Sequence, residues 1–93
     1  MGATDFAVSI KTTKRADAAY RQIVEEAVYD YGHHPYNGTI STTDGYVSVP
    51  ESFGSVSEVR GYINKHIHDY HKWSSCGHIA YNGTHYFFGL AAE

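Results

Sequence analysis

The stretch Ile79-Ala80-Tyr81-Asn82-Gly83-Thr84-His85-Tyr86 carries the strongest folding signal in the chain, because an Asn-Gly pair separates two runs of alternating residues. Asn and Gly readily adopt the positive φ angles of a two-residue type I′ turn. Such a turn fixes the register of the strands that it joins. We therefore expect a final hairpin of residues 78–81 and 84–90, with Tyr81 opposite Thr84, Ala80 opposite His85 and Ile79 opposite Tyr86.

Alternation along this hairpin separates its side chains into two sets, because successive residues of a strand point to opposite faces. One face is predicted to carry Ile79, Tyr81, Tyr86, Phe88 and Leu90, and the other His78, Ala80, His85 and Phe87.

The N-terminal third of the chain predicts a strand followed by a helix. Residues 5–10 alternate, with Phe6, Val8 and Ile10 on one face, as in a half-buried strand. Apolar residues then recur every three or four positions from Ala16 to Tyr31, which is typical of one helical face. Thr12 or Thr13 is expected to cap the start of this helix, and Gly32 its end.

The middle of the chain predicts two more strands and a second helix. Residues 39–43 and 46–49 alternate around Asp44-Gly45, which favours a second tight hairpin. Ser55 and Glu58 form a capping box, and an apolar stripe then runs from Val56 to Tyr70. We expect this helix to end near His71.

These elements predict one α+β domain over residues 1–93, in the order β-α-β-β-α-β-β. Two helices with one apolar stripe each can cover one face of a five-stranded, mostly antiparallel sheet. The first six elements match the ferredoxin-like order, with the last strand added at an edge. The expected spatial order of the strands is 5-4-1-3-2.

Composition limits the function. The net charge is −3 and the Lys and Arg residues are dispersed, which disfavours direct binding of nucleic acid. The chain has one cysteine, Cys76, so no internal disulfide is expected, and it carries neither a secretory signal nor an apolar run of membrane-spanning length. We expect a cytoplasmic protein without a membrane partner.

Tyrosine is over-represented, with nine residues against a single leucine. Tyrosine offers a large contact area with a polar tip, which suits binding surfaces as well as small sheets. We expect aromatic and histidine side chains after the two helices to contact a protein partner, and carboxylates of the first helix to meet basic patches on it. The predicted contacts are Tyr29, His33, Tyr36 and Trp73, with Glu25, Glu26 and Asp30.

Catalytic and metal-binding motifs are absent from the sequence, so no cofactor is expected. An alternative is a small metal-dependent or histidine-dependent enzyme, in which His68 and His71 share a helical face and His33 supplies a third ligand. Cys76 and His78 lie two residues apart in an extended segment, and we interpret Cys76 as a structural thiol.

The segment Tyr31-Gly32-His33-His34-Pro35-Tyr36-Asn37-Gly38-Thr39-Ile40, with Lys72-Trp73 and Tyr86-Phe87-Phe88-Gly89-Leu90-Ala91, resembles a pattern in short proteins of phages and other mobile elements. Ser74 stands where that pattern has glycine after the tryptophan. The resemblance implies a host-takeover or anti-defence factor, such as an anti-CRISPR protein. It carries no catalytic motif.

The leading hypothesis is thus a non-enzymatic binding protein, encoded by a phage, that inhibits a host defence complex by steric blocking of a protein partner. Its partner would be a host nucleic-acid-handling complex. Another hypothesis is an RRM-like RNA-binding domain, which would stack bases on Phe87, His85 and His78 from an open sheet face. Homodimerisation through an exposed last strand is a further expectation, because an unpaired edge can template pairing.

Overall fold

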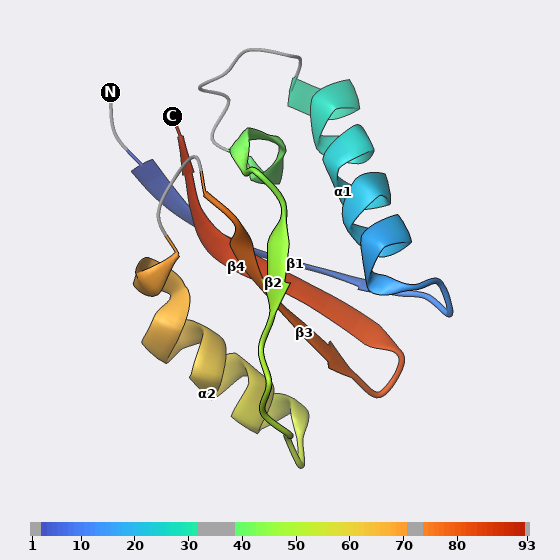
Figure 1. Cartoon of the computed structure of the whole chain (residues 1–93), viewed down its shortest axis with the longest axis vertical. Coiled ribbons are helices and arrows are strands. Elements are labelled where there is room, and N and C mark those ends of the chain that lie inside the picture. The colour runs from blue at the N-terminus through green and yellow to red at the C-terminus, as the bar shows by residue number, and fades with distance from the viewer. Residues whose placement is uncertain (1–2, 32–38, 71–73, 93) are drawn as a thin grey trace.

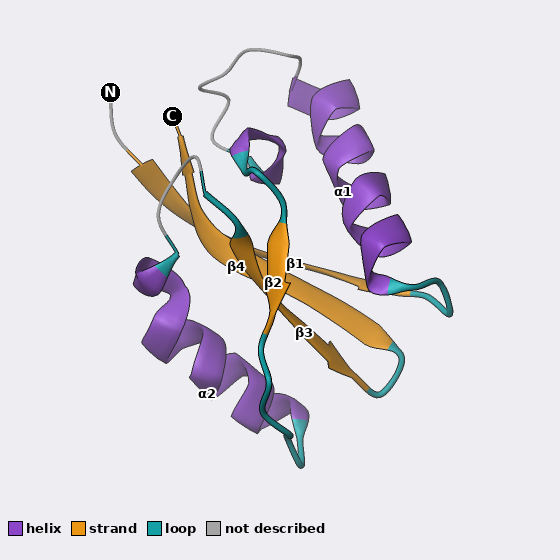
Figure 2. Ribbon diagram, in the orientation of Figure 1, coloured by secondary structure: helices purple, strands orange, loops and turns teal. Residues whose placement is uncertain are grey.

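A computed structural model describes residues 3–31, 39–70 and 74–92 of the chain. Within these ranges the chain forms a small α+β domain with a four-stranded mixed sheet and two α-helices (Figure 1, Figure 2). The strands are β1 (Ala3–Lys11), β2 (Tyr46–Ser48), β3 (Cys76–Tyr81) and β4 (Thr84–Ala92). The helices are α1 (Ala16–Tyr31) and α2 (Val56–His66), and two 3₁₀ segments are η1 (Ile40–Thr42) and η2 (Ile67–Asp69).

The C-terminal hairpin forms in the predicted register. Tyr81 pairs with Thr84, Ala80 with His85 and Ile79 with Tyr86. Asn82 and Gly83 have φ angles of 50° and 80°, so both turn residues occupy the left-handed region that a type I′ turn requires.

The sheet has the spatial order β1-β4-β3-β2. β4 runs antiparallel to β1 and to β3, whereas β2 runs parallel to β3. α2 is therefore the crossover helix between two parallel neighbouring strands, an arrangement that a hairpin cannot provide. The spatial order 5-4-1-3-2 expected from the sequence is wrong, because the last strand lies inside the sheet between β1 and β3.

Two successive phenylalanines explain why β4 is a central strand. Phe87 and Phe88 are both fully buried, and they must point to opposite faces of the sheet. Phe87 packs in a cluster with Ala19 of α1, whereas Phe88 packs in a cluster with Val59 of α2. The helices thus cover opposite faces, as Figure 1 also shows, and the prediction that both cover one face is wrong.

The predicted hairpin around Asp44-Gly45 does not form, so the sheet has four strands where five were expected. Residues 40–42 form η1, in which Thr42 Oγ1 donates to the Thr39 carbonyl at 3.0 Å. This side-chain bond competes with extended structure. The Asp44 amide donates to the Ser74 carbonyl, and the Cys76 amide to the Gly45 carbonyl. The turn residues are therefore bonded to Ser74 and to the first residue of β3, and not to a second strand of the predicted hairpin.

Both helices form close to where the sequence predicts them. α1 covers the predicted residues 16–31. The Ser55 hydroxyl accepts from the Glu58 amide at 3.2 Å, as in a capping box, and the Glu58 carboxylate reaches back to the Gly54 amide, one residue before the N-cap. α2 ends at His66 and continues as η2 to Asp69, close to the predicted end. Among the described residues, no helix is both long and apolar enough to cross a membrane.

Gly77 of β3 provides a test of the core. A Cβ atom at this position would lie 2.4 Å from Cζ of Phe88, so Gly77→Ala forces the ring out of its place. We expect the free energy of unfolding to fall by about 1–3 kcal/mol, as for other overpacked core substitutions. Urea denaturation of the variant and the parent measures this difference.

Gly61→Ala is the matched control. Nothing lies within 4 Å of a Cβ atom at Gly61, which is exposed in the interior of α2. Here the same substitution should raise the free energy of unfolding by about 0.5–1 kcal/mol, because alanine favours helix over glycine. Equal stability of Gly77→Ala and the parent would contradict the packing of Phe88 over Gly77.

Candidate functional site

The outward face of the C-terminal half of α1 is the first candidate site. The apolar stripe of α1 packs into the core, which leaves Glu25, Glu26 and Asp30 exposed. Tyr29 is 90% exposed, more than any other large hydrophobic side chain of the described residues. These four residues and Gln22 line one open hollow, and we call this set the α1 surface.

The α1 surface is negatively charged, and its carboxylates form no ion pair within the described residues, although Lys14 Nζ donates to the side-chain oxygen of Gln22 at 3.2 Å. The last turn of α1 contains no basic residue. The ion pairs found among the described residues join His66 to Asp69 and His68 to Asp5, and neither involves a carboxylate of α1. The partial negative charge of a helix C-terminus adds to the repulsion. A positively charged partner would therefore reduce the repulsion among these carboxylates and the C-terminal end of α1.

The structure brings together four of the seven predicted contact residues. Glu25, Glu26, Tyr29 and Asp30 lie together on the helix surface, because Tyr29 is four positions after Glu25 and three after Glu26, and Asp30 is four after Glu26. The other three, His33, Tyr36 and Trp73, lie outside the described residues, and their contribution stays a prediction.

The alternative metal site is not assembled by the part of the chain that the structure describes. His71 and His33 lie outside it, and the side chain of His68 is 72% exposed, with its Nε2 3.7 Å from the Asp5 carboxylate. No cluster of three or more His, Cys, Asp or Glu side chains suited to a metal ion occurs within residues 3–31, 39–70 and 74–92.

A hydrogen-bonded chain that the sequence did not predict crosses the α1-facing side of the sheet. The Ser48 hydroxyl lies 2.9 Å from Nδ1 of His78, and Nε2 of His78 lies 2.9 Å from Nδ1 of His85. Nε2 of His85 lies 3.0 Å from the carbonyl oxygen of Lys14, in the segment before α1. We call these four groups the histidine relay.

The donor and acceptor roles in the histidine relay follow from its last member. A carbonyl oxygen only accepts, so His85 must donate from Nε2 to Lys14. Neutral His85 therefore accepts at Nδ1, and His78 donates to it from Nε2. His78 then accepts at Nδ1 from the Ser48 hydroxyl. One tautomer of each imidazole satisfies all three bonds, provided that both rings are neutral.

The surroundings of His78 keep its ring neutral. His78 is 3% exposed and stacks on His85, with 5.1 Å between the ring centroids. Phe87 and Tyr46 flank it, at centroid distances of 4.9 and 5.3 Å. Desolvation, with a smaller contribution from His85, lowers the pKa of His78 from 6.5 to about 4.

A serine bonded to an oriented imidazole has the geometry of a nucleophile and its general base. General bases work best when their pKa lies near the working pH, however, and the pKa of His78 is about 4. At neutral pH this ring is a weak proton acceptor. The relay is therefore suited to satisfying buried polar groups.

Cys76 is a structural thiol, as expected. Its side chain is 1% exposed, and burial raises its pKa to about 12, so the thiol stays protonated.

The sheet face predicted to stack RNA bases is not open. Phe87 is fully buried, His78 is 3% exposed, and His85 is half-buried within the relay. α1 covers this face, since Phe87 packs in a cluster with Ala19 of α1, and α2 covers the opposite face. Base stacking on these rings would require α1 to leave the sheet, so the structure removes the support for that prediction.

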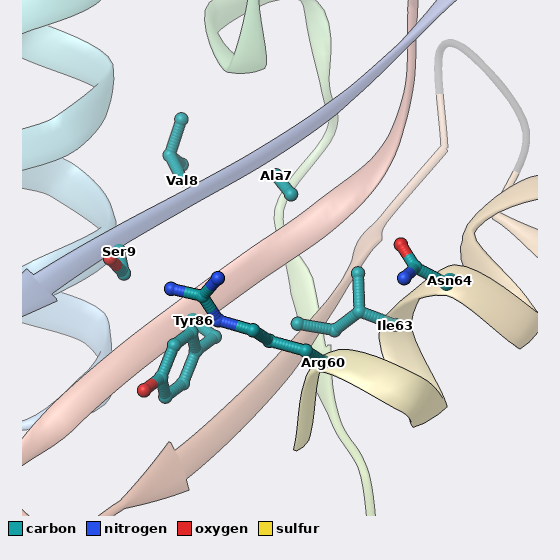
Figure 3. A pocket seen from close by; sticks show the side chains of 7 residues that line it. All are labelled: Ala7, Val8, Ser9, Arg60, Ile63, Asn64 and Tyr86. Carbon is teal, nitrogen blue, oxygen red and sulfur yellow. The ribbon is translucent and has the colours of Figure 1, made fainter. Parts of the chain in front are cut away.

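A groove between β1 and α2 is a further hollow among the described residues. Its volume is about 350 Å³. Figure 3 shows Arg60 reaching from α2 across the groove toward β1, above Tyr86. The residues that line it are Ala7, Val8, Ser9, Arg60, Ile63, Asn64 and Tyr86. No motif in the sequence indicated this groove, because its walls come from three separate elements.

Comparisons of the chain with protein-family models, with characterised proteins and with solved structures gave no match. The resemblance to short phage proteins therefore stays a prediction.

The histidine relay predicts a pH dependence of stability. In the unfolded chain His78 titrates near 6.5, whereas in the folded protein its pKa is about 4. Between these pH values the unfolded state binds more protons than the folded state. The contribution of His78 to the free energy of unfolding is therefore fully present above pH 6.5 and is lost as the pH falls toward 4. The loss attributable to His78 is about 3 kcal/mol at most. Denaturant titrations from pH 4 to 8 measure it.

His78→Asn removes the titrating group, and His68→Asn removes an exposed one. The first variant should show a flatter dependence of the free energy of unfolding on pH, whereas the second should follow the parent. Parallel pH profiles for His78→Asn and the parent would contradict the assignment of a buried, neutral His78.

Proposed function

We propose that this protein is a small binding protein that docks its α1 surface on a positively charged patch of a larger protein partner. The observation that carries the proposal is the placement of Tyr29, 90% exposed, among three carboxylates without an ion-pair partner in the described structure. In this proposal the protein acts by occupying a site on its partner and performs no catalysis.

The chemistry of the α1 surface suits arginine and lysine side chains. Carboxylates such as Glu25 and Glu26 form ion pairs with a guanidinium group, and arginine also stacks on aromatic rings such as that of Tyr29. Exposed tyrosines are frequent anchors of protein interfaces because they add contact area at low entropic cost. The rigid helix presents the carboxylates and the ring together, so little ordering is needed on binding.

A partner that handles nucleic acid fits this chemistry. Such proteins carry basic patches that contact phosphate groups, and a negatively charged protein surface can occupy the same patch. Together with the resemblance to phage proteins, this supports a phage-encoded inhibitor of a host defence complex, similar to an anti-CRISPR protein, that acts in the host cytoplasm by steric blocking. His33, Tyr36 and Trp73 are further proposed contacts.

Reversing the charge of the α1 surface tests the proposal. The variant Glu25→Lys/Glu26→Lys should bind its partner at least about tenfold more weakly at low salt, because both long-range attraction and ion pairing are lost. The partner is first captured from host lysate on the immobilised parent protein and identified. Affinities are then measured with the purified partner over a range of salt concentrations, and nucleic-acid binding by the partner is followed in parallel.

The matched control is Asp17→Lys/Glu51→Lys, which changes the net charge equally at two exposed positions outside the α1 surface. This control should bind like the parent. Tyr29→Ala should weaken binding even at high salt, since the ring contributes through contact area. Equal losses in the two charge variants would show a general charge effect and refute docking through α1. Unchanged nucleic-acid binding by the captured partner would refute steric blocking.

A further inference from the structure

β1 is an edge strand with one unpaired side. Its nine residues pair one by one with β4 on the inner side. On the outer side, no other backbone group of the described residues bonds to Ala3–Lys11. Long unpaired edges are templates for pairing with a further strand. This edge is distinct from the last strand, β4, which is paired on both sides, so the expected dimerisation through β4 is wrong.

The two faces of β1 differ in character along this edge. Phe6, Val8 and Ile10 point toward the α1 side and are only half-buried. Asp5 and Lys11 point to the α2 side and are exposed. The edge therefore presents an apolar row on one face and one charge of each sign on the other.

We propose that β1 of a second copy of this chain pairs antiparallel with this edge, with Val8 on the twofold axis. A closed dimer of this kind uses the same patch on both copies. Residues whose numbers add up to sixteen then face each other across the interface. The facing pairs are Val8 with Val8, Ala7 with Ser9, Phe6 with Ile10 and Asp5 with Lys11.

The apolar row is self-complementary in this register. Phe6 of each copy faces Ile10 of the other, and the two Val8 side chains face each other at the centre. Pairs of aromatic and β-branched residues are among the favourable cross-strand neighbours. The row is half-buried in one copy, and pairing would remove more of it from water.

The charges are complementary in the same register. Asp5 of each copy faces Lys11 of the other, which gives two opposite-charge pairs per dimer. The Asp5 side chain is 57% exposed and its carboxylate is 3.7 Å from His68 Nε2, so it remains accessible to an ammonium group. Opposite charges on directly facing strand positions are stabilising, and like charges are destabilising.

The registers centred on Ala7 or Ser9 keep some apolar pairs, such as Phe6 with Val8, but lose both pairs of Asp5 with Lys11. Centring the pair on Ala7 overlaps more residues, but it places Ile10 opposite Thr4 and Lys11 opposite Ala3. Centring on Ser9 places Lys11 opposite Ala7. A shift by one residue would set the apolar row of one copy against the polar row of the other. The Val8 register is the arrangement that matches both faces.

Pairing through β1 also joins the two grooves. Ala7 and Ser9 line the groove between β1 and α2 (Figure 3), and in the proposed register they face Ser9 and Ala7 of the second copy. A twofold axis perpendicular to the sheet keeps both α2 helices on one face. The dimer would thus carry one continuous trough, with an Arg60 from each copy directed into it.

Engineered cysteines read out the register directly. Val8→Cys should form a disulfide-linked dimer under mild oxidation, because the two thiols face each other across the axis. Cys76 is buried and does not compete. Ala7→Cys reports the register centred on Ala7, and Asp17→Cys, on an exposed position of α1, reports random collisions. Linkage of Val8→Cys no faster than that of Asp17→Cys, or preferential linkage of Ala7→Cys, would overturn the proposal.

A charge exchange gives an independent test. Sedimentation equilibrium of the parent from about 10 μM to 1 mM should show a monomer–dimer equilibrium, and a monomer throughout would refute the proposal. Lys11→Asp should raise the dimer dissociation constant by about tenfold or more, since two attractive pairs become repulsive. Asp5→Lys/Lys11→Asp should restore it to within about threefold of the parent. A double variant whose dimer dissociation constant stays as high as that of Lys11→Asp would exclude the proposed pairs.

The tests of dimerisation through β1 are independent of the proposed docking function of the α1 surface. Glu25→Lys/Glu26→Lys lies on α1 and should leave the dimer dissociation constant unchanged, whereas Lys11→Asp should leave docking of the α1 surface intact at concentrations where both proteins are monomeric.

Discussion

Burial of Phe87 and Phe88 on opposite faces of one strand is the constraint that organises this domain. Burying a phenylalanine side chain fully is worth about 1.5–3 kcal/mol, a large share of the stability that a domain of this size can have. One helix layer cannot bury both rings, because adjacent strand residues point in opposite directions. β4 must therefore lie inside the sheet, with α1 on one face and α2 on the other.

The α1-facing layer also has to accommodate polar groups. His78 lies beside Phe87 and is nearly excluded from water. A buried imidazole without partners would cost about 1–3 kcal/mol for each lost hydrogen bond. Ser48 and His85 satisfy the two ring nitrogens of His78, and the Lys14 carbonyl in turn satisfies Nε2 of His85. The relay thus links β2, β3, β4 and the segment before α1. In this arrangement His78 stays neutral near neutral pH.

The layered packing also decides which surfaces remain for partners. The central strands are covered on both faces, so the two recognition features found among the described residues lie at the rim of the sheet and on the outer face of a helix. Tyr29 and its neighbouring carboxylates occupy the outer face of α1. The unpaired side of β1 and the groove beside it occupy the rim. These features have different chemistry, one acidic and aromatic and the other a backbone edge with an arginine nearby, and they suit different partners.

The sequence by itself determined the features that depend on near neighbours in the chain. The Asn82-Gly83 turn set the hairpin register, the capping box at Ser55 set the start of α2, and helical spacing placed Tyr29 with its carboxylates. The tertiary structure alone decided the order of the strands and the assembly of the histidine relay. His78 and His85 were expected on one face, but their bond to Ser48 requires the parallel pairing of β2 with β3. Turn residues and side-chain periodicity act over a few positions, whereas the Ser48–His78 and His85–Lys14 bonds join residues 30 and 71 positions apart. Such long-range pairings depend on how two faces of apolar surface are buried at once.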